Sequence, residues 1–312
     1  MRAVGIMTHG GPEALEVLEV PDQEAGEGQI RIRNFAASVN PVDVSVRNGS
    51  MAEMQKINPP PYVPGMDAAG VIDQIGDDVE TDLKVGDSVM AMVVPNGIHG
   101  AYKEYIVLDK NAVVRAPKET SHIQASTLPM NSLTARLSLN LLGLNKGQVL
   151  AVTGGPGAYG GFVIQLAKAD GLTVIADSKE SDRDLLESLG VDIIIPRGEG
   201  FAERVREEFP NGVDGIADGA LLNESAIEAV KDGGSFTSVR GFKGEPQRDI
   251  DFTATWVTAY DCKKDILETL CQQAEEGVLT LRVAGSVTME NAAEAHKKLE
   301  AGGTRGRMVI EF

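Results

Sequence analysis

Cysteine is scarce in this chain, which has only Cys262 and Cys271 among its 312 residues. Two thiols cannot supply a four-thiolate zinc site, and they cannot build the disulfide framework of a small secreted domain. Four widely scattered histidines show no metal-binding spacing: His9, His99, His122 and His296. The scarcity fits a reducing compartment, so we expect a cytoplasmic protein that binds no metal.

Basic residues and long apolar runs are also in short supply. The 29 Lys and Arg residues are outnumbered by 46 Asp and Glu residues, which gives a formal net charge of −17. Such a surface repels phosphate backbones and anionic lipid headgroups, so we expect neither nucleic acid nor a membrane as a partner. No apolar segment is long enough to span a bilayer, and the first residues lack the core of a secretory signal.

The first part of the chain is rich in short apolar runs separated by Gly, Pro and Asp. These runs predict strands at residues 2–7, 15–20, 29–38, 68–76, 88–94 and 101–108. Three consecutive prolines at positions 59–61 exclude a helix or sheet interior there. Residues 1–121 therefore predict a β-rich domain.

The pattern changes after Ser121, which has capping-box spacing with Gln124 and predicts the start of a helix. Strands are then predicted to alternate with helices through residues 148–239, and the last of these helices is predicted at 225–231. Such alternation is typical of parallel βαβ units in a doubly wound Rossmann sheet, so the fold class is α/β. A further helix is expected at 265–276 and a last strand at 307–312.

A glycine-rich turn follows the strand predicted at 149–153. Gly155, Gly157 and Gly160 satisfy the G-x-G-x-x-G spacing, and Ala158 and Tyr159 lie between them. Glycine permits the tight turn, the approach of the backbone to a pyrophosphate, and close packing of helix on strand. Because the turn joins a strand to a helix, we expect these five residues to bind a dinucleotide.

The form of the dinucleotide stays open at this point. Asp177 ends the next predicted strand, where an acid typically binds the adenosine ribose of NADH and repels the 2′-phosphate of NADPH. Lys179 and Arg183 follow closely and could neutralise that phosphate.

Three further segments carry a resemblance to a known family. They are residues 37–43 (Ala-Ser-Val-Asn-Pro-Val-Asp), 62–71 (Tyr-Val-Pro-Gly-Met-Asp-Ala-Ala-Gly-Val) and 128–135 (Leu-Pro-Met-Asn-Ser-Leu-Thr-Ala). With the glycine-rich turn, they make the chain similar to the zinc-free quinone oxidoreductases of the medium-chain dehydrogenase/reductase superfamily. The resemblance implies a Rossmann domain at 122–260 and a chaperonin-10-like catalytic domain at 1–121 and 261–312, with the active site in the cleft.

The zinc-dependent members of that superfamily carry Cys, His and Cys as catalytic metal ligands. The matching positions here are Asn40, Met66 and Met130, none of which is a plausible zinc ligand. Without zinc a simple ketone is poorly polarised, whereas a quinone or an α,β-unsaturated carbonyl spreads the incoming charge over a conjugated system. We therefore expect NADPH-dependent reduction of a small-molecule quinone or enone, with NADH as the alternative cofactor.

The resemblance also implies catalytic residues. Asn40 is the candidate for a hydrogen bond to the acceptor oxygen or the nicotinamide ribose, because an amide donates and accepts without titrating. Asp43 would orient it, and Thr134 would lie beside the nicotinamide. Tyr62 is the nearest tyrosine to the loop in which the family often places a proton donor, although solvent could serve instead.

Gly241 and Phe242 match the region where chains of this family pass the nicotinamide, and relatives are often homodimers. Two alternative functions stay open. One is an enoyl-thioester or 2-alkenal reductase on the same fold, and the other is a cofactor-binding protein without turnover.

Overall fold

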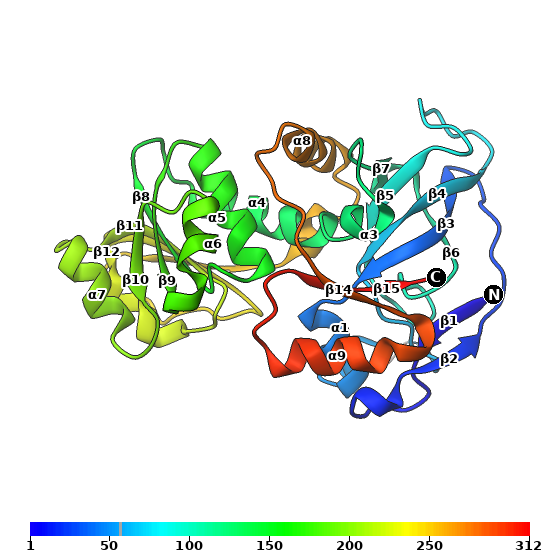
Figure 1. Ribbon diagram of the computed structural model, residues 1–312, viewed down its shortest axis with the longest axis horizontal. Coiled ribbons are helices and arrows are strands. Elements are labelled where there is room, and N and C mark those ends of the chain that lie inside the picture. Colours follow the sequence, from blue (N-terminus) through cyan, green and yellow to red (C-terminus); the bar gives the residue numbers. More distant parts are fainter. Residues whose placement is uncertain (56–57) are drawn as a thin grey trace. The chain divides into compact units, whose positions relative to one another are not determined.

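The computed structural model describes residues 1–55 and 58–312 of the chain (Figure 1). The chain forms two compact units. Unit 1 contains Met1–Met130, Tyr260–Glu276 and Leu281–Phe312, and unit 2 contains Asn131–Ala259 and Gly277–Thr280.

Unit 1 is built on a seven-stranded sheet with the order β14-β15-β3-β4-β5-β7, in which β6 also pairs with β3. Its strands are β3 (Gln29–Ser38), β4 (Asp67–Ile75), β5 (Ser88–Met92), β6 (Tyr105–Asp109), β7 (Val113–Arg115), β14 (Val283–Thr288) and β15 (Arg307–Glu311). A separate antiparallel pair consists of β1 (Arg2–Gly5) and β2 (Glu16–Glu19). The β-rich domain predicted from the short apolar runs is confirmed.

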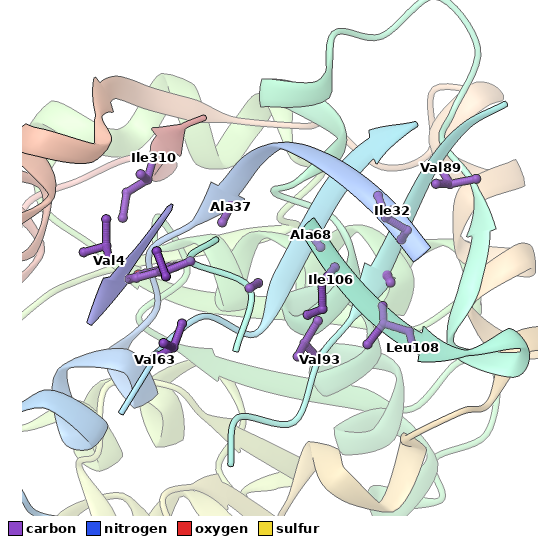
Figure 2. Close-up of a cluster of buried hydrophobic side chains, with 14 of the residues drawn as sticks. Val4, Ile32, Ala37, Val63, Ala68, Val89, Val93, Ile106, Leu108 and Ile310 are labelled. Carbon is purple, nitrogen blue, oxygen red and sulfur yellow. The ribbon is translucent and has the colours of Figure 1, made fainter. Parts of the chain in front are cut away.

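The strands of unit 1 enclose one apolar core. Along β3, Ile30 and Ile32 are fully buried while Arg33 is exposed, as the two-residue period of a strand requires. Figure 2 shows Ile32 grouped with Ile106 and Val89, and Ile310 of the last strand near Val4 of the first.

Unit 1 also contains short helices. They are α1 (Pro41–Asn48), α2 (Ala52–Gln55), α3 (His122–Ala125), α8 (Lys264–Glu275) and α9 (Ala292–Ala301). The capping box predicted for α3 is confirmed, since Ser121 Oγ accepts the Gln124 N–H and Gln124 Oε1 accepts the Ser121 N–H. The helix α4 (Pro129–Leu142) begins in unit 1 and continues in unit 2.

Unit 2 is a six-stranded parallel sheet with the order β10-β9-β8-β11-β12-β13. The strands are β8 (Val149–Thr153), β9 (Thr173–Ser178), β10 (Ile193–Pro196), β11 (Val213–Asp218), β12 (Val230–Val239) and β13 (Asp251–Thr255), and the helices between them are α5 (Ala158–Ala169), α6 (Arg183–Ser188) and α7 (Phe201–Glu208). The α/β doubly wound sheet predicted from the alternation is confirmed.

The strand order places a topological switch point in unit 2. From β8 the chain proceeds outward to β9 and β10, then returns to β11 on the other side of β8. Doubly wound sheets bind ligands outside the carboxyl ends of the strands at such a point. The loops after β8 and β11 are therefore where a dinucleotide site is expected.

No helix in residues 1–55 and 58–312 has the length and apolar character needed to cross a membrane.

Candidate functional site

The glycine-rich turn joins β8 to α5, as its spacing predicts. Gly154 has φ +69°, and Gly157 is the N-cap of α5. A Cβ on Gly160 would stand 2.4 Å from the carbonyl oxygen of Gly154, so only glycine allows this close approach of helix to turn. The turn fits a dinucleotide, because a glycine-rich turn that leads into the N-terminus of a helix is the arrangement that binds a pyrophosphate.

Asp177 is tied into the turn. One carboxylate oxygen accepts the Gly154 N–H at 3.0 Å, and the other accepts the Nε–H of Arg197 at 2.7 Å. Its side chain is only 6 % exposed. Asp177 therefore joins β9 to the turn and forms an ion pair with Arg197. An acid that binds the ribose of NADH is instead accessible and has no such partner.

The three cations near this end of the sheet differ in their partners. Arg183 forms ion pairs with Glu180 and Glu187, so its charge is compensated on the surface. Lys179 is exposed. Arg197, which sequence analysis missed, follows β10 and has a side chain 32 % exposed. No local motif marked it, because its role arises only from the lateral pairing of β10 with β9.

Hydroxyl groups connect the turn to α4 and to the sheet. The Tyr159 hydroxyl donates to Ser138 Oγ at 2.7 Å, and Ser138 Oγ lies 2.9 Å from Thr255 Oγ1. Burial raises the pKa of Tyr159, so its hydroxyl stays protonated. The predicted site residue Thr134 lies one helical turn before Ser138, and its carbonyl lies 2.9 Å from Ser138 Oγ.

Gly241 and Phe242 follow β12. Gly241 has φ +85°, and a Cβ there would stand 2.7 Å from Trp256. The Phe242 ring packs edge-on against Phe236 with ring centroids 5.8 Å apart. Phe242 therefore contributes to the core of unit 2, and cofactor contact by either residue stays a prediction.

In unit 1, the side chain and the backbone N–H of Asn40 each donate a hydrogen bond to a buried carboxylate. Its side-chain amide donates to Asp67 at 2.7 Å, and its backbone N–H donates to Asp43 at 2.8 Å. Asp67 also accepts the Ser38 hydroxyl at 2.6 Å and the Met130 N–H at 2.7 Å. All of these groups are buried, so the orientation of the Asn40 amide is determined by Asp67.

The two carboxylates differ from ordinary surface acids. Burial raises the pKa of Asp43 to about 7, opposed by the N–H groups of Asn40 and Gly65 and by the Tyr102 hydroxyl. Burial also raises the pKa of Asp67, while the hydroxyl of Ser38 lowers it. Asp67 lies inside a sequence motif, but no local pattern gave it a role, because its partners come from two other segments, one with Ser38 and Asn40 and one with Met130.

A chain of polar contacts leads from Asp43 toward the surface. Tyr102 donates to Asp43 at 3.0 Å, and its oxygen lies 3.3 Å from Nε2 of His296. Arg47 lies 3.4 Å from Nδ1 of His296 and donates to Glu300 at 2.7 Å. Burial, and then the charge of Arg47, lowers the pKa of His296 to about 3, so this imidazole is neutral. These contacts fix α1, whose N-cap residue is Asn40.

Tyr62 lies in a separate environment. Its hydroxyl donates to the Asn58 carbonyl at 3.0 Å, and its ring stacks on His9 with centroids 5.3 Å apart. A proton-donor role for Tyr62 stays a prediction.

The donor set does not fit zinc. Asn40, Met66 and Met130 offer an amide and two thioethers, which are poor zinc ligands. Within residues 1–55 and 58–312, no group of three His, Cys, Asp or Glu side chains is arranged to hold a metal ion.

Two family models match the chain. Residues 26–118 match the alcohol dehydrogenase GroES-like domain, and residues 189–310 match the zinc-binding dehydrogenase model.

Similar proteins span nearly the whole chain. A 2-methylene-furan-3-one reductase from Solanum lycopersicum is 30 % identical over 99 % of this chain and 79 % of its own length. An NADPH-dependent alkenal/one oxidoreductase from Arabidopsis thaliana is 29 % identical with the same coverage.

Solved structures are similar as well. An NAD-dependent alcohol dehydrogenase is 28 % identical with a TM-score of 0.89, and each chain is covered completely. The quinone oxidoreductase from Coxiella burnetii is 27 % identical with a TM-score of 0.87, covering 100 % of this chain and 99 % of the other.

Proposed function

The chain belongs to the medium-chain dehydrogenase/reductase superfamily, among its quinone and enone oxidoreductases, and we propose that it reduces quinones or α,β-unsaturated carbonyls with a reduced nicotinamide cofactor. The observation that carries the proposal is the combination of the glycine-rich turn with Asn40, Met66 and Met130 at the positions of the catalytic zinc ligands. The bound cofactor would supply the hydride, and the protein would orient the two reactants.

The chemistry of these residues selects the acceptor. An oxygen that gains full negative charge needs a strong counter-charge, which the amide and thioethers of this set do not provide. A conjugated acceptor spreads that charge and needs only a hydrogen bond. Because Asp67 orients the amide of Asn40, we propose that Asn40 is the polar group that the acceptor meets.

We further propose that NADPH is the preferred form of the cofactor. Both oxygens of Asp177 are engaged, one by the turn and one by Arg197, so its charge is balanced. Arg197 uses its Nε–H for this pair, and the planar guanidinium suits bidentate binding of a phosphate. Lys179 adds a second cation at the same end of the sheet. The name of the Arabidopsis relative also specifies NADPH.

Steady-state kinetics test the function. The loss of reduced-nicotinamide absorbance is followed with a quinone, an enone, an enoyl thioester and a simple ketone as acceptors. We expect turnover with the quinone or the enone and none with the ketone. Asn40→Ala should lower kcat/KM by about tenfold or more, since removal of one transition-state donor typically costs that much. Turnover of the ketone alone would contradict the proposal, and turnover of the thioester alone would replace the substrate class.

The cofactor proposal has its own variants. Arg197→Gln keeps a donor for Asp177 and removes the charge, so kcat/KM for NADPH should fall about ten- to hundredfold while that for NADH changes little. Arg183→Gln is the matched control, because its guanidinium is already paired with glutamates. The assignment of Arg197 would be contradicted if Arg197→Gln lowered kcat/KM equally for NADPH and NADH, or if Arg183→Gln lowered kcat/KM for NADPH as much as Arg197→Gln does.

We also propose a homodimer in the cytoplasm. In unit 2, β13 ends the strand order, so its outer edge offers backbone groups for pairing with a second copy. Both cysteines are free thiols, which suits a reducing compartment. Sedimentation equilibrium tests the dimer, and a monomer mass at micromolar concentration would contradict it.

A further inference from the structure

The last residues of β8 and β11 are bonded to each other at the switch point. The hydroxyl of Thr153 donates to Asp218 at 2.5 Å, and both side chains are fully buried. These two strands are neighbours in the sheet. The bond therefore joins the two strand ends between which the dinucleotide crevice opens.

Asp218 and Thr153 also hold the loop that follows β11. Asp218 accepts the N–H of Leu222 at 3.1 Å and the N–H of Asn223 at 2.7 Å. Thr153 Oγ1 accepts the N–H of Ala220 at 2.9 Å. Three backbone N–H groups of this loop, those of Ala220, Leu222 and Asn223, are thus fixed by two side chains.

The same loop has an unfavourable backbone conformation. Leu221 has φ +60° and Asn223 has φ +51°. This region suits glycine and is tolerated by asparagine, but it is strained for leucine. Strain of this kind persists only where surrounding contacts enforce it, and it concentrates at binding sites.

The loop packs directly on the glycine-rich turn. A Cβ on Gly154 would stand 3.3 Å from the Ala220 nitrogen, and a Cβ on Gly219 would stand 2.7 Å from the Tyr159 ring. The turn and the loop therefore pack against each other at the carboxyl ends of β8 and β11. Since the adenosine end of a dinucleotide lies over β9, the loop after β11 lies on the nicotinamide side.

We propose that Asp218 is a positioning residue for the cofactor, and this inference rests on the proposed function. With Thr153, it holds residues 219–223 in a strained conformation that shapes the nicotinamide side of the crevice. We call the hydrogen bonds from Thr153 and Asp218 to this loop the clamp. The conformation of the loop depends on the clamp, because Leu221 would relax to negative φ if these hydrogen bonds were lost.

Calorimetric titration with NADPH tests the proposal on the full chain. Asp218→Asn replaces an acceptor with a donor facing the loop, so the Kd for NADPH should rise about tenfold. The KM for the acceptor at saturating NADPH should stay unchanged. Adding Leu221→Gly to Asp218→Asn should restore most of the affinity, because glycine adopts positive φ without strain.

Asp214→Asn is the matched control. Asp214 lies on the same strand and accepts the Val149 N–H at 2.8 Å, but at the opposite end of β11. It should lower the Tm and leave the Kd for NADPH unchanged. Thr153→Val serves if Asp218→Asn does not fold, and it should also raise the Kd.

The outcomes separate this inference from the proposed function. An Asp218→Asn variant with a lowered Tm and the wild-type Kd would make the clamp purely structural and overturn the inference alone. Failure of Leu221→Gly to restore affinity would overturn the role given to strain. A wild-type chain that binds neither NADPH nor NADH would overturn the proposed function and this inference with it.

Discussion

Lys103 provides a quantitative test of how burial shapes the stability of unit 1. Its side chain is fully buried, and its ammonium donates to the Gln23 side chain at 3.0 Å and to the Ile98 carbonyl at 3.2 Å. Neither partner is charged. Burial lowers the pKa of Lys103 from 10.5 to about 8. We predict that Lys103→Met, which keeps the length of the side chain, stabilises the protein at neutral pH.

The magnitude follows from proton linkage. A lysine whose folded pKa is depressed destabilises the folded state most below that folded pKa, and this cost disappears as the pH rises toward the unfolded pKa. At pH 7 the burial of Lys103 therefore costs about 3 kcal/mol, and near pH 9.5 it costs about half of that, at 1.36 kcal/mol per pKa unit. Loss of the two neutral hydrogen bonds offsets about 1 to 2 kcal/mol. The expected net gain at pH 7 is about 1 to 2 kcal/mol.

Urea unfolding at a series of pH values from 7 to 9.5 measures this effect. The difference in unfolding free energy between Lys103→Met and wild type should shrink by about 1.5 to 2 kcal/mol over that range. Lys297→Met on the exposed surface of α9 is the control and should change stability by less than about 0.5 kcal/mol at every pH. A stability difference for Lys103→Met that does not depend on pH would refute burial as the dominant effect.

Three further predictions concern the turn, the buried carboxylate and the thiols. Gly160→Ala should weaken NADPH binding by at least about tenfold in calorimetry, because its Cβ would meet a backbone oxygen at 2.4 Å; unchanged affinity would contradict the geometry of the turn. Tyr102→Phe should lower the unfolding free energy by about 1 to 3 kcal/mol in urea, since Asp43 loses a buried donor; a neutral effect would contradict the network. A thiol reagent at pH 8 should label exposed Cys262 slowly, because partial desolvation and then the charge of Asp261 raise its pKa to about 11, and should label buried Cys271 only after unfolding, as peptide mass spectrometry would show.

The parts of the fold that were predictable from sequence are those encoded by local patterns. The capping of α3 by Ser121 and Gln124 needs only a three-residue spacing, and the turn before α5 needs only glycines at fixed offsets. The region after β11 was less accessible. A helix was predicted at 225–231, whereas a 3-10 helix spans Asn223–Ala229 and β12 already begins at Val230.

The candidate site was predictable to a smaller extent, because its contacts depend on the lateral pairing of strands. Asp177 was found at the end of a strand, but its partner Arg197 directly follows the neighbouring strand, and parallel register has no local signal. Asp67 acquires its role from Ser38, Asn40 and Met130, which only the folded chain brings together.

The pairing of the last strand with an early one has a consequence for biosynthesis. In unit 1, β15 pairs with β3 through Val309 and Ile310, opposite Ser38 and Ala37. The ribosome adds the roughly 270 intervening residues at about 5–20 residues per second, so β3 waits tens of seconds for this partner. All strands of unit 2 are complete before β15 emerges. The nascent chain therefore carries an open, apolar strand edge until β15 is made, and such an edge is the kind of surface that chaperones bind and that promotes aggregation.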